Sequence, residues 1–207
     1  MKAVIVALTI AWFVFVLLNF TQSNVFLFLF VLFAAVERFW ETFLASKQNI
    51  LDKKSEFDWL FKLISYYYVL VMFGTVMEYL FIKKRLYPGL TVAGIIAFFL
   101  ALALRLGSIR ALGGSWNTYV LGKLKRKLRP RRLIRKGPYK FLRHPIYLGA
   151  IVEALSIPAI FNSYCTLGFV ILLYVPLLIL RAYLEEQELI RIFGKGYVRY
   201  QNKTVGF

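Results

Sequence analysis

Long apolar stretches, separated by polar segments, constrain the fold of this chain more than any other feature of its sequence. The hydrocarbon core of a bilayer is about 30 Å thick, so a helix needs roughly 20 apolar residues to cross it. Four stretches meet this requirement: residues 3–20, 25–45, 61–82 and 90–112. The first carries no clear small-x-small cleavage site, and we expect it to be a retained membrane anchor.

Two further apolar stretches, residues 147–161 and 164–180, form a pair. The turn between them, Phe161 to Tyr164, is so short that the two helices must run antiparallel as a hairpin. The sequence therefore predicts an all-α, polytopic integral membrane protein with about six transmembrane helices. In this arrangement the C-terminal helices form a hairpin and both termini lie on the same side of the membrane.

The composition of the chain supports a membrane protein. Of the 207 residues, 60% are hydrophobic and only 18% are charged, which is too apolar for a soluble domain of this length. The net charge of +17 would suggest nucleic acid as a partner in a soluble protein, but here the basic residues lie between apolar segments. Anionic lipid headgroups are therefore the expected counterions, and no nucleic acid is expected. Cys165 is the single cysteine, and no Cys/His set has zinc spacing, so we expect no metal site.

A basic segment follows the fourth apolar stretch. Residues 123–143 carry eleven Lys or Arg, and the positive-inside rule places this segment, and with it both termini, in the cytoplasm. We expect residues 1–112 to form the N-terminal transmembrane helices. Residues 113–207 would then hold the basic loop, the final hairpin, a cytoplasmic pocket and a C-terminal tail.

Several charged side chains fall inside the predicted spans: Glu37, Arg38, Glu41, Glu78, Arg105 and Glu153. Each would cost several kcal/mol if it faced lipid, so each should face the bundle interior, pair with another charge, or reach the surface. One interpretation is pairing between or along helices, for example Arg38 with Glu41 or Glu37. The other is a polar pocket between the spans.

The only histidine, His144, lies between Arg143 and Pro145, directly after the basic segment. The proline alone could explain this motif, because a helix tolerates proline in its first turn. Tyr139 and Tyr147 flank the histidine, however, and three glutamates with a preceding arginine come where the last span should leave the membrane: Arg181, Glu185, Glu186 and Glu188. The hairpin would bring the two stretches to one membrane depth. An i, i+4 pair of Arg181 with Glu185 is the alternative interpretation.

These motifs, in this order, resemble the isoprenylcysteine carboxyl methyltransferases and their prokaryotic relatives, a family of membrane methyltransferases. The resemblance covers about half of the chain, from Arg105 to Tyr200. It consists of the segments Leu112-Gly-Gly-Ser-Trp116, Leu133-Ile-Arg-Lys-Gly-Pro-Tyr139, Arg143-His-Pro-Ile-Tyr-Leu-Gly149, Arg181 with Glu185-Glu186, and Phe193-Gly-Lys-Gly-Tyr-Val-Arg-Tyr200.

The resemblance implies that S-adenosylmethionine binds in a pocket made by the loop before the last hairpin and by the segment after it. The implied cofactor contacts come from Arg131, Arg132, Leu133, Ile134, Tyr139, His144, Pro145, Ile146, Tyr147, Glu185 and Glu186. Arg181 matches the substrate-side arginine of the family, and His144 is the second candidate catalytic residue. Because this chain has Arg135 and Lys136 where the family often has Ser or Thr, backbone contacts transfer better than side-chain ones.

The chemistry of these residues suits S-adenosylmethionine. Glu185 or Glu186 can pair with its ammonium group or accept from its hydroxyls, and His144 or an arginine can bind its carboxylate. A tyrosine can pack on the adenosine. Arg143 can bind either substrate or a lipid phosphate.

The acceptor is expected to be lipophilic and to enter from the bilayer. A carboxylate acceptor is already ionised at neutral pH and could be held by Arg181. A phenol or enol would instead need its proton removed, for which His144 is the candidate. Residues 36–49 weakly resemble a bacterial subgroup in which some members methylate phenolic or pyrone lipids.

Two other classes of function remain open at this point. Membrane sterol and steroid reductases share an Arg-His-Pro-x-Tyr hairpin but use NADPH, and they commonly have Asp-Glu-x-x-Cys where this chain has Glu185-Glu-Gln-Glu188. A small transporter or lipid-binding protein is the second alternative. The intramembrane charges would then form its conduction or binding path. The oligomeric state is left open.

Overall fold

The computed structural model describes residues 25–39, 58–82, 87–113 and 133–206. The chain divides into two compact units, Met1–Ala45 and Ser46–Phe207. The first unit contributes one described helix, α2 (Val25–Phe39), whose start coincides with that of the second predicted span. The first predicted span, residues 3–20, lies outside the described residues.

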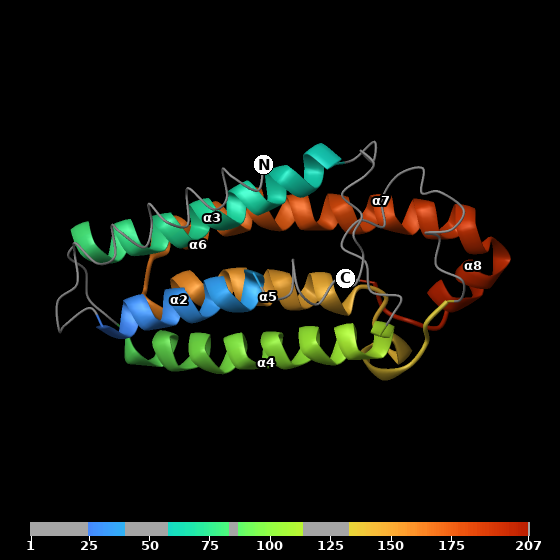
Figure 1. Ribbon diagram of the computed structural model, residues 1–207, viewed down its shortest axis with the longest axis horizontal. Coiled ribbons are helices and arrows are strands. Elements are labelled where there is room, and N and C mark those ends of the chain that lie inside the picture. The colour runs from blue at the N-terminus through green and yellow to red at the C-terminus, as the bar shows by residue number, and fades with distance from the viewer. Residues whose placement is uncertain (1–24, 40–57, 83–86, 114–132, 207) are drawn as a thin grey trace. The chain divides into compact units, whose positions relative to one another are not determined.

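The described part of the second unit is mainly helical. Its elements are α3 (Asp58–Phe81), α4 (Pro88–Leu112), the 3₁₀ helix η5 (Gly137–Lys140), α5 (Pro145–Ile160), α6 (Tyr164–Phe169), the π-helical η6 (Val170–Tyr174), α7 (Val175–Phe193) and α8 (Lys195–Gln201) (Figure 1). A single β-bridge joins Leu142 to Val205, and the described ranges contain no β-strand. The predicted all-α class is therefore confirmed.

Three described helices are long and apolar enough to cross a membrane. They are Trp59–Phe81, Pro88–Leu112, and the continuous helix Tyr164–Phe193, with mean hydropathies of 1.6, 2.2 and 2.2. Helices α2 and α5 are apolar but shorter. The chain is thus an all-helical membrane protein, and the count of six spans stays a prediction.

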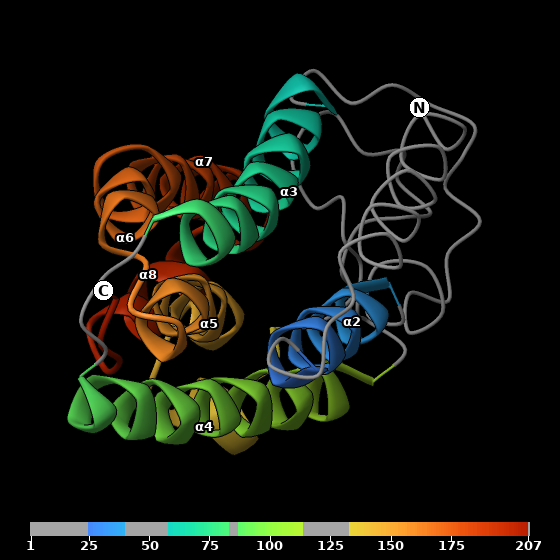
Figure 2. The ribbon, with the colours of Figure 1, turned by 90° about the vertical axis from the view of Figure 1, so that its left-hand side faces the viewer.

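The long helices of the second unit run in alternating directions, so their ends gather at two opposite poles (Figures 1 and 2). The start of α3, the end of α4, the start of α5, the end of α7 and α8 meet at one pole, which we call the site end. Phe61 near the start of α3 lies 5.2 Å from the Arg181 guanidinium of α7, which fixes this pairing of ends. At the opposite pole, Thr91 near the start of α4 donates to the carbonyl of Ile160 at the end of α5 (2.9 Å).

Helices α4 and α5 approach each other closely at two glycines. A Cβ atom at Gly94 would lie 2.9 Å from the backbone nitrogen of Ile160, and one at Gly149 would lie 3.1 Å from the carbonyl oxygen of Ala101. Small residues allow helix backbones to come this near in a membrane. The close contact holds the start of α5 firmly beside α4.

A buried charge pair links the same two helices. Arg105 of α4 pairs with Glu153 of α5, and both side chains are almost completely buried. Tyr68 of α3 donates a hydrogen bond to the other oxygen of Glu153 (2.9 Å). For these two charges, therefore, the pairing interpretation of the intramembrane residues is the one that the structure shows.

The predicted hairpin is present, with a turn at residues 161–163 between α5 and α6. Asn162 occupies the left-handed region (φ 54°), which asparagine tolerates better than most residues. Its side chain accepts from the backbone N–H of Tyr87 (2.9 Å) and donates to Thr91 (2.9 Å), which ties the turn to the start of α4.

The second helix of the hairpin continues to Phe193, thirteen residues beyond the predicted end of the span at residue 180. It widens to a π-helix at Val170–Tyr174, directly before Pro176 in the first turn of α7. A proline has no N–H to donate and its ring crowds the carbonyl one turn earlier, and a π-turn relieves both problems. The extension carries Arg181, Glu185 and Glu186 to the site end.

Candidate active site

A hydrogen-bonded chain joins α5 to α7 at the site end. The Tyr147 hydroxyl donates to Glu185 Oε2 (2.6 Å) and accepts from Arg181 Nε (3.0 Å). Tyr147 is in the first turn of α5, where Pro145 starts the helix, and the two charged residues are one turn apart on α7. Tyr147 therefore bridges the arginine and the glutamate.

Glu186 forms a second polar cluster with the residues that precede α5. Its Oε1 accepts from Arg143 Nη1 (2.8 Å) and lies 3.0 Å from His144 Nε2, and its Oε2 accepts from Gln201 Nε2 (3.1 Å). The His144 side chain is 4% exposed, whereas those of Arg143 and Glu186 are about one-fifth exposed. One carboxylate thus connects the α5 start, α7 and α8.

The Arg181 guanidinium lies between two aromatic rings. Its central carbon is 5.2 Å from the Phe61 ring centroid and 5.8 Å from that of Tyr147. Arg181 is buried at 8% exposure, and cation–π contacts of this kind stabilise a guanidinium that has lost water. The arrangement holds the positive charge at the site end, between a ring of α3 and a ring of α5.

Helix α8 and the residues after it pack against the segment that precedes α5. Gly194 has φ 53° and ends α7, so α8 turns back toward η5 (Figure 1). The Tyr200 hydroxyl of α8 reaches the carbonyl oxygens of Tyr139 (2.7 Å) and Leu142 (3.2 Å). Val205 then exchanges backbone hydrogen bonds with Phe141 and Arg143, both at 2.9 Å.

Three tyrosines of this region are held in their neutral form. Burial, and after it the negative charge of Glu185, keeps the pKa of Tyr139 well above its ordinary value. Burial likewise raises the pKa of Tyr197, with Glu186 and Glu185 adding to the effect, and it raises the pKa of Tyr200. These phenols are therefore hydrogen-bond donors at neutral pH.

The structure brings together most of the site residues that the sequence predicts. Arg143, His144, Tyr147, Arg181, Glu185 and Glu186 are joined by the contacts given above. Tyr139 lies in η5, close enough to Glu185 to respond to its charge. Pro145 and Ile146 form the first turn of α5, and Leu133 and Ile134 are half-buried before η5. Arg131 and Arg132 lie outside the described residues.

Sequence reasoning missed several residues of the cluster: Phe61, Gln201, Tyr197 and Tyr200. Phe61 stands at the start of an apolar stretch, where an aromatic residue carries no special signal. The other three belong to the C-terminal tail, whose sequence motif indicates the family but no role for individual side chains. Tyr197 is 1% exposed, and no described group lies within hydrogen-bonding distance of its hydroxyl.

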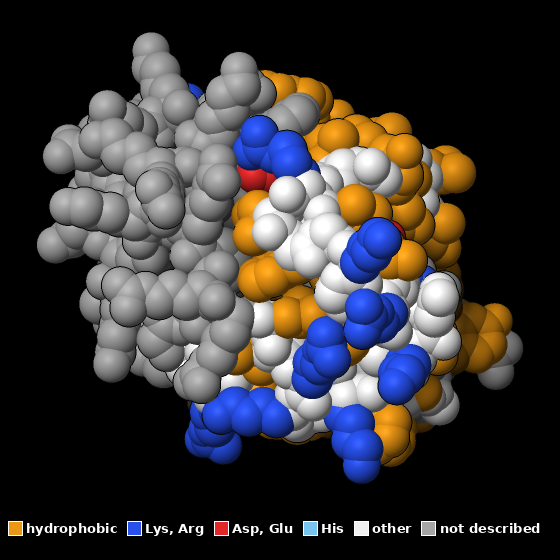
Figure 3. All heavy atoms as spheres, turned by 90° about the vertical axis from the view of Figure 1, so that its right-hand side faces the viewer, with side chains coloured by type: hydrophobic (Ala, Val, Ile, Leu, Met, Phe, Trp, Pro, Cys, Tyr) orange, Lys and Arg blue, Asp and Glu red, His pale blue; other side chains and the backbone are white. Residues whose placement is uncertain are grey.

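The site end presents a basic face to its surroundings. Figure 3 shows Lys and Arg side chains spread across the described part of this face. The exposed basic residues there are Arg135, Lys136, Lys140, Arg191, Lys195, Arg199 and Lys203. Such a face suits contact with anionic groups.

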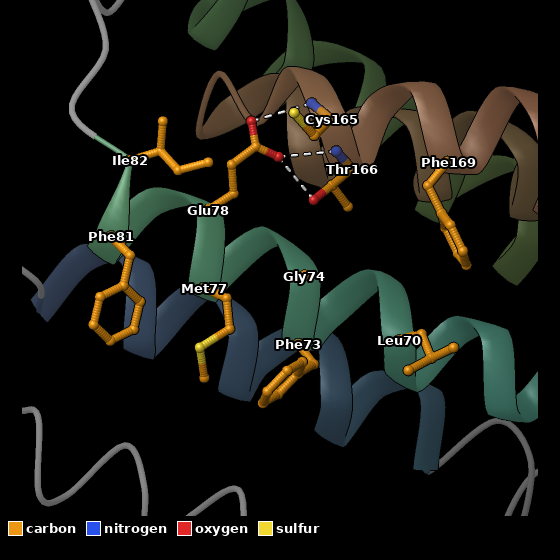
Figure 4. A pocket seen from close by; sticks show the side chains of 10 residues that line it. All are labelled: Leu70, Phe73, Gly74, Met77, Glu78, Phe81, Ile82, Cys165, Thr166 and Phe169. Carbon is orange, nitrogen blue, oxygen red and sulfur yellow. Dashed lines mark hydrogen bonds between the residues drawn. The ribbon is translucent and has the colours of Figure 1, made fainter.

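An apolar groove lies at the opposite pole, between α3 and α6 (Figure 4). Its volume is about 530 Å³, and its walls include Leu70, Phe73, Met77 and Phe169. The carboxylate of Glu78 accepts from the backbone N–H groups of Cys165 (3.1 Å) and Thr166 (2.9 Å), so it caps the first turn of α6. At about 1.5 Å per residue, the start of α6 at Tyr164 is roughly 26 Å from Arg181.

The charged groups at the site end fit S-adenosylmethionine by their chemistry. Two carboxylates suit an ammonium group and sugar hydroxyls, while Arg143, His144 and Arg181 suit a carboxylate. The buried Tyr197 hydroxyl adds a donor that no described residue uses. No group of three His, Cys, Asp or Glu side chains that could hold a metal ion occurs within the described ranges.

These features define a class of protein. It is an all-helical membrane protein with a polar cluster at one pole, formed by the start of α5, the end of α7 and the short helix α8. A family model described as the isoprenylcysteine carboxyl methyltransferase (ICMT) family matches residues 93–191, from α4 to the end of α7. The chain belongs to this family.

Individual relatives agree with this assignment. Uncharacterized protein YpbQ of Bacillus subtilis (strain 168) is 30% identical over 123 residues, which cover 59% of this chain and 69% of that protein. Methanethiol S-methyltransferase 1 of Bradyrhizobium diazoefficiens is 38% identical over 66 residues, 32% of this chain and 22% of that protein. The structure of the eukaryotic intramembrane Ras methyltransferase ICMT has the same fold, with a TM-score of 0.68 at 19% identity over 91% of this chain and 68% of that one.

Proposed function

We propose that this chain is an integral membrane methyltransferase that moves a methyl group from S-adenosylmethionine to a carboxylate or hydroxyl of a lipophilic acceptor. The observation that carries the proposal is the joint placement of Tyr147, Arg181 and Glu185 beside Arg143, His144 and Glu186 at one pole of a membrane helix bundle. In this proposal residues 113–207 form the methyl-transfer part, and residues 1–112 form the N-terminal transmembrane part.

The residues around the two glutamates would hold the methyl donor. Glu185 would accept from sugar hydroxyls or the ammonium group, while Arg143 and His144 would bind the carboxylate beside Glu186. Tyr139, neutral and half-buried, would pack on the adenosine. Arg131 and Arg132, with Leu133 and Ile134, would contribute from the loop before η5, and Pro145 and Ile146 from the helix start.

Arg181 would hold the acceptor. The donor, when bound, would supply a methyl group on a positively charged sulfur, and this sulfur would leave with the carbon–sulfur electron pair as an acceptor oxygen bonds to the methyl carbon. The protein then contributes mainly position and exclusion of water. Arg181 is fixed by Tyr147 and Phe61, so its charge can orient a carboxylate; for a hydroxyl acceptor, His144 would take the proton.

Membrane partitioning would deliver the acceptor. The site end lies at the end of helices that are long and apolar enough to cross a bilayer, so a substrate with a lipid tail could reach it laterally. Its basic face would bind anionic headgroups and lie in the cytoplasm according to the positive-inside rule. The full arrangement would have six spans with both termini on that side.

Acceptor identification tests the proposal directly. Purified protein in lipid nanodiscs is incubated with methyl-labelled S-adenosylmethionine and a membrane lipid extract, and products are separated and identified by mass spectrometry. We expect label in a lipid acid or hydroxyl compound. Arg181→Ala serves as the inactive control.

Two results would change the proposal. Label in a small thiol alone would make the chain an S-methyltransferase, in line with the name of the Bradyrhizobium relative. Binding of the donor with no labelled product in any fraction would contradict a lipid acceptor.

A further inference from the structure

Tyr197 is a buried phenol that the contacts of the site leave unused. Its side chain is 1% exposed in α8, and its ring packs 5.8 Å from that of Tyr200. Its hydroxyl is inaccessible and has no hydrogen-bond partner among the described residues. Burying a hydroxyl without a partner is unfavourable, because the group loses its hydrogen bonds to water, so such groups are rare unless something else bonds to them.

The surroundings of this hydroxyl are the charged groups of the site. Glu186 and Glu185 are the charges that act on it most strongly, and the Arg143 guanidinium is also close. Both carboxylates nevertheless lie beyond direct hydrogen-bonding reach of the phenol. Both oxygens of Glu186 are already bonded by Arg143, His144 and Gln201.

Glu185 has spare acceptor capacity. Its Oε2 accepts from Tyr147, and the described residues supply no hydrogen bond to its Oε1. The charge of Glu185 thus acts on a phenol that lacks a hydrogen-bond partner, and no direct hydrogen bond joins the two groups. Only a group that both accepts and donates satisfies the two together. A ligand hydroxyl or a water molecule does so, whereas an ammonium group only donates and a carboxylate only accepts.

We propose that the Tyr197 hydroxyl donates a hydrogen bond to a ribose hydroxyl of the bound methyl donor, and that this ribose hydroxyl donates in turn to Glu185. The inference rests on the proposed function, because it takes S-adenosylmethionine as the ligand. It assigns α8 a direct part in binding, beyond its structural contacts through Tyr200. The raised pKa of Tyr197 agrees with this role, since a neutral phenol keeps its proton for donation.

The test compares Tyr197→Phe with the unaltered protein, using S-adenosylhomocysteine and its 2′-deoxy and 3′-deoxy analogues as probes. Dissociation constants are measured by calorimetry in nanodiscs. We expect Tyr197→Phe to weaken binding of the intact probe by about five- to tenfold, the loss of one buried hydrogen bond. One deoxy analogue should bind both proteins equally, because the partner of Tyr197 is gone. Tyr183→Phe is the matched control, since this tyrosine of α7 is 58% exposed, and it should bind like the unaltered protein.

A second readout separates binding from a purely structural role. Without ligand, Tyr197→Phe should unfold at the same temperature or a higher one, because it removes a buried hydroxyl that has no described partner. Unchanged affinity for the intact probe would overturn the inference, and so would an equal loss for all three probes. If the unaltered protein binds none of the probes, the proposed function itself is contradicted.

Discussion

At the scale of single residues, two neighbouring glutamates serve different partners because of helix geometry. Successive residues of an α-helix point about 100° apart, so Glu185 and Glu186 face different elements. Glu185 meets Tyr147 of α5, while Glu186 meets His144 and the tail residue Gln201. A pair of carboxylates in sequence thus becomes two separate anchor points.

Tyr147→Phe tests the bridge between α5 and α7. The substitution keeps the ring beside Arg181 but removes the hydroxyl that joins Arg181 to Glu185. We expect kcat/KM to fall by about tenfold or more, because Arg181 loses a fixed position. Methyl transfer is measured with saturating donor, and Tyr183→Phe is again the control. Unaltered kcat/KM in Tyr147→Phe would show that the bridge has no part in turnover.

Arg181→Ala tests the division of roles within the cluster. The variant should bind the methyl donor with nearly unaltered affinity, because the donor-binding groups lie around Glu186 and Glu185. Turnover should be lost, since nothing would then orient the acceptor. Calorimetry and methyl transfer are measured on the same preparation. Normal turnover would mean that Arg181 serves only local pairing with Tyr147.

At the scale of elements, the hairpin could be predicted because two apolar runs with a short polar turn allow few other folds. The end of the second helix of the hairpin could not be predicted. A span prediction stops where charges begin, near Arg181, whereas hydrogen bonding within the helix continues past these charges as far as Gly194. The π-helical segment also escaped prediction, although Pro176 marks the place where backbone bonding must change.

Part of the candidate site could also be predicted from where its polar residues lie along the sequence. His144, Tyr147, Glu185 and Glu186 stand out because polar residues at the ends of apolar runs are conspicuous. Phe61 is one aromatic residue among many, and only the packing of α3 against α7 brings it to Arg181. The role of Tyr147 as the bridge between Arg181 and Glu185 likewise depends on the rotation of α5, which the pattern does not fix.

Close packing of α4 on α5 makes a specific prediction about stability. In Gly94→Ala, the new methyl group would meet the backbone nitrogen of Ile160 at 2.9 Å, so the free energy of unfolding should fall by about 1–3 kcal/mol. Gly168→Ala is the matched control, because nothing lies within 4 Å of its added Cβ and helical alanine is favoured over glycine. Both are measured by denaturant titration in detergent micelles. Equal stability of the two variants would contradict the close α4–α5 contact.

At the scale of the molecule, the described helices of the second unit place a polar, basic cluster at one pole and an apolar groove near the other. The site end collects the charged cluster and the exposed Lys and Arg side chains, whereas the opposite pole holds the apolar groove and the capped start of α6. This polarity is what a protein needs if it takes a soluble donor from one side and a lipophilic acceptor from the bilayer.

The single cysteine gives a test of orientation. Cys165 is exposed at the pole opposite the site, whereas Lys203 is exposed at the site end. With the site end in the cytoplasm, a membrane-impermeant maleimide added to intact cells should label Cys165. A Cys165→Ser/Lys203→Cys variant should be labelled only after the cells are opened. The reverse pattern would place the site on the outer side and contradict the proposed topology.

Equilibrium binding shows whether the protein takes S-adenosylmethionine, and not NADPH, as its cofactor. Labelled S-adenosylmethionine is titrated into the purified protein in nanodiscs, with NADPH and S-adenosylhomocysteine as competitors. We expect saturable binding that S-adenosylhomocysteine displaces and that excess NADPH leaves in place. Binding of NADPH without binding of S-adenosylmethionine would contradict this expectation and would make the chain a reductase instead.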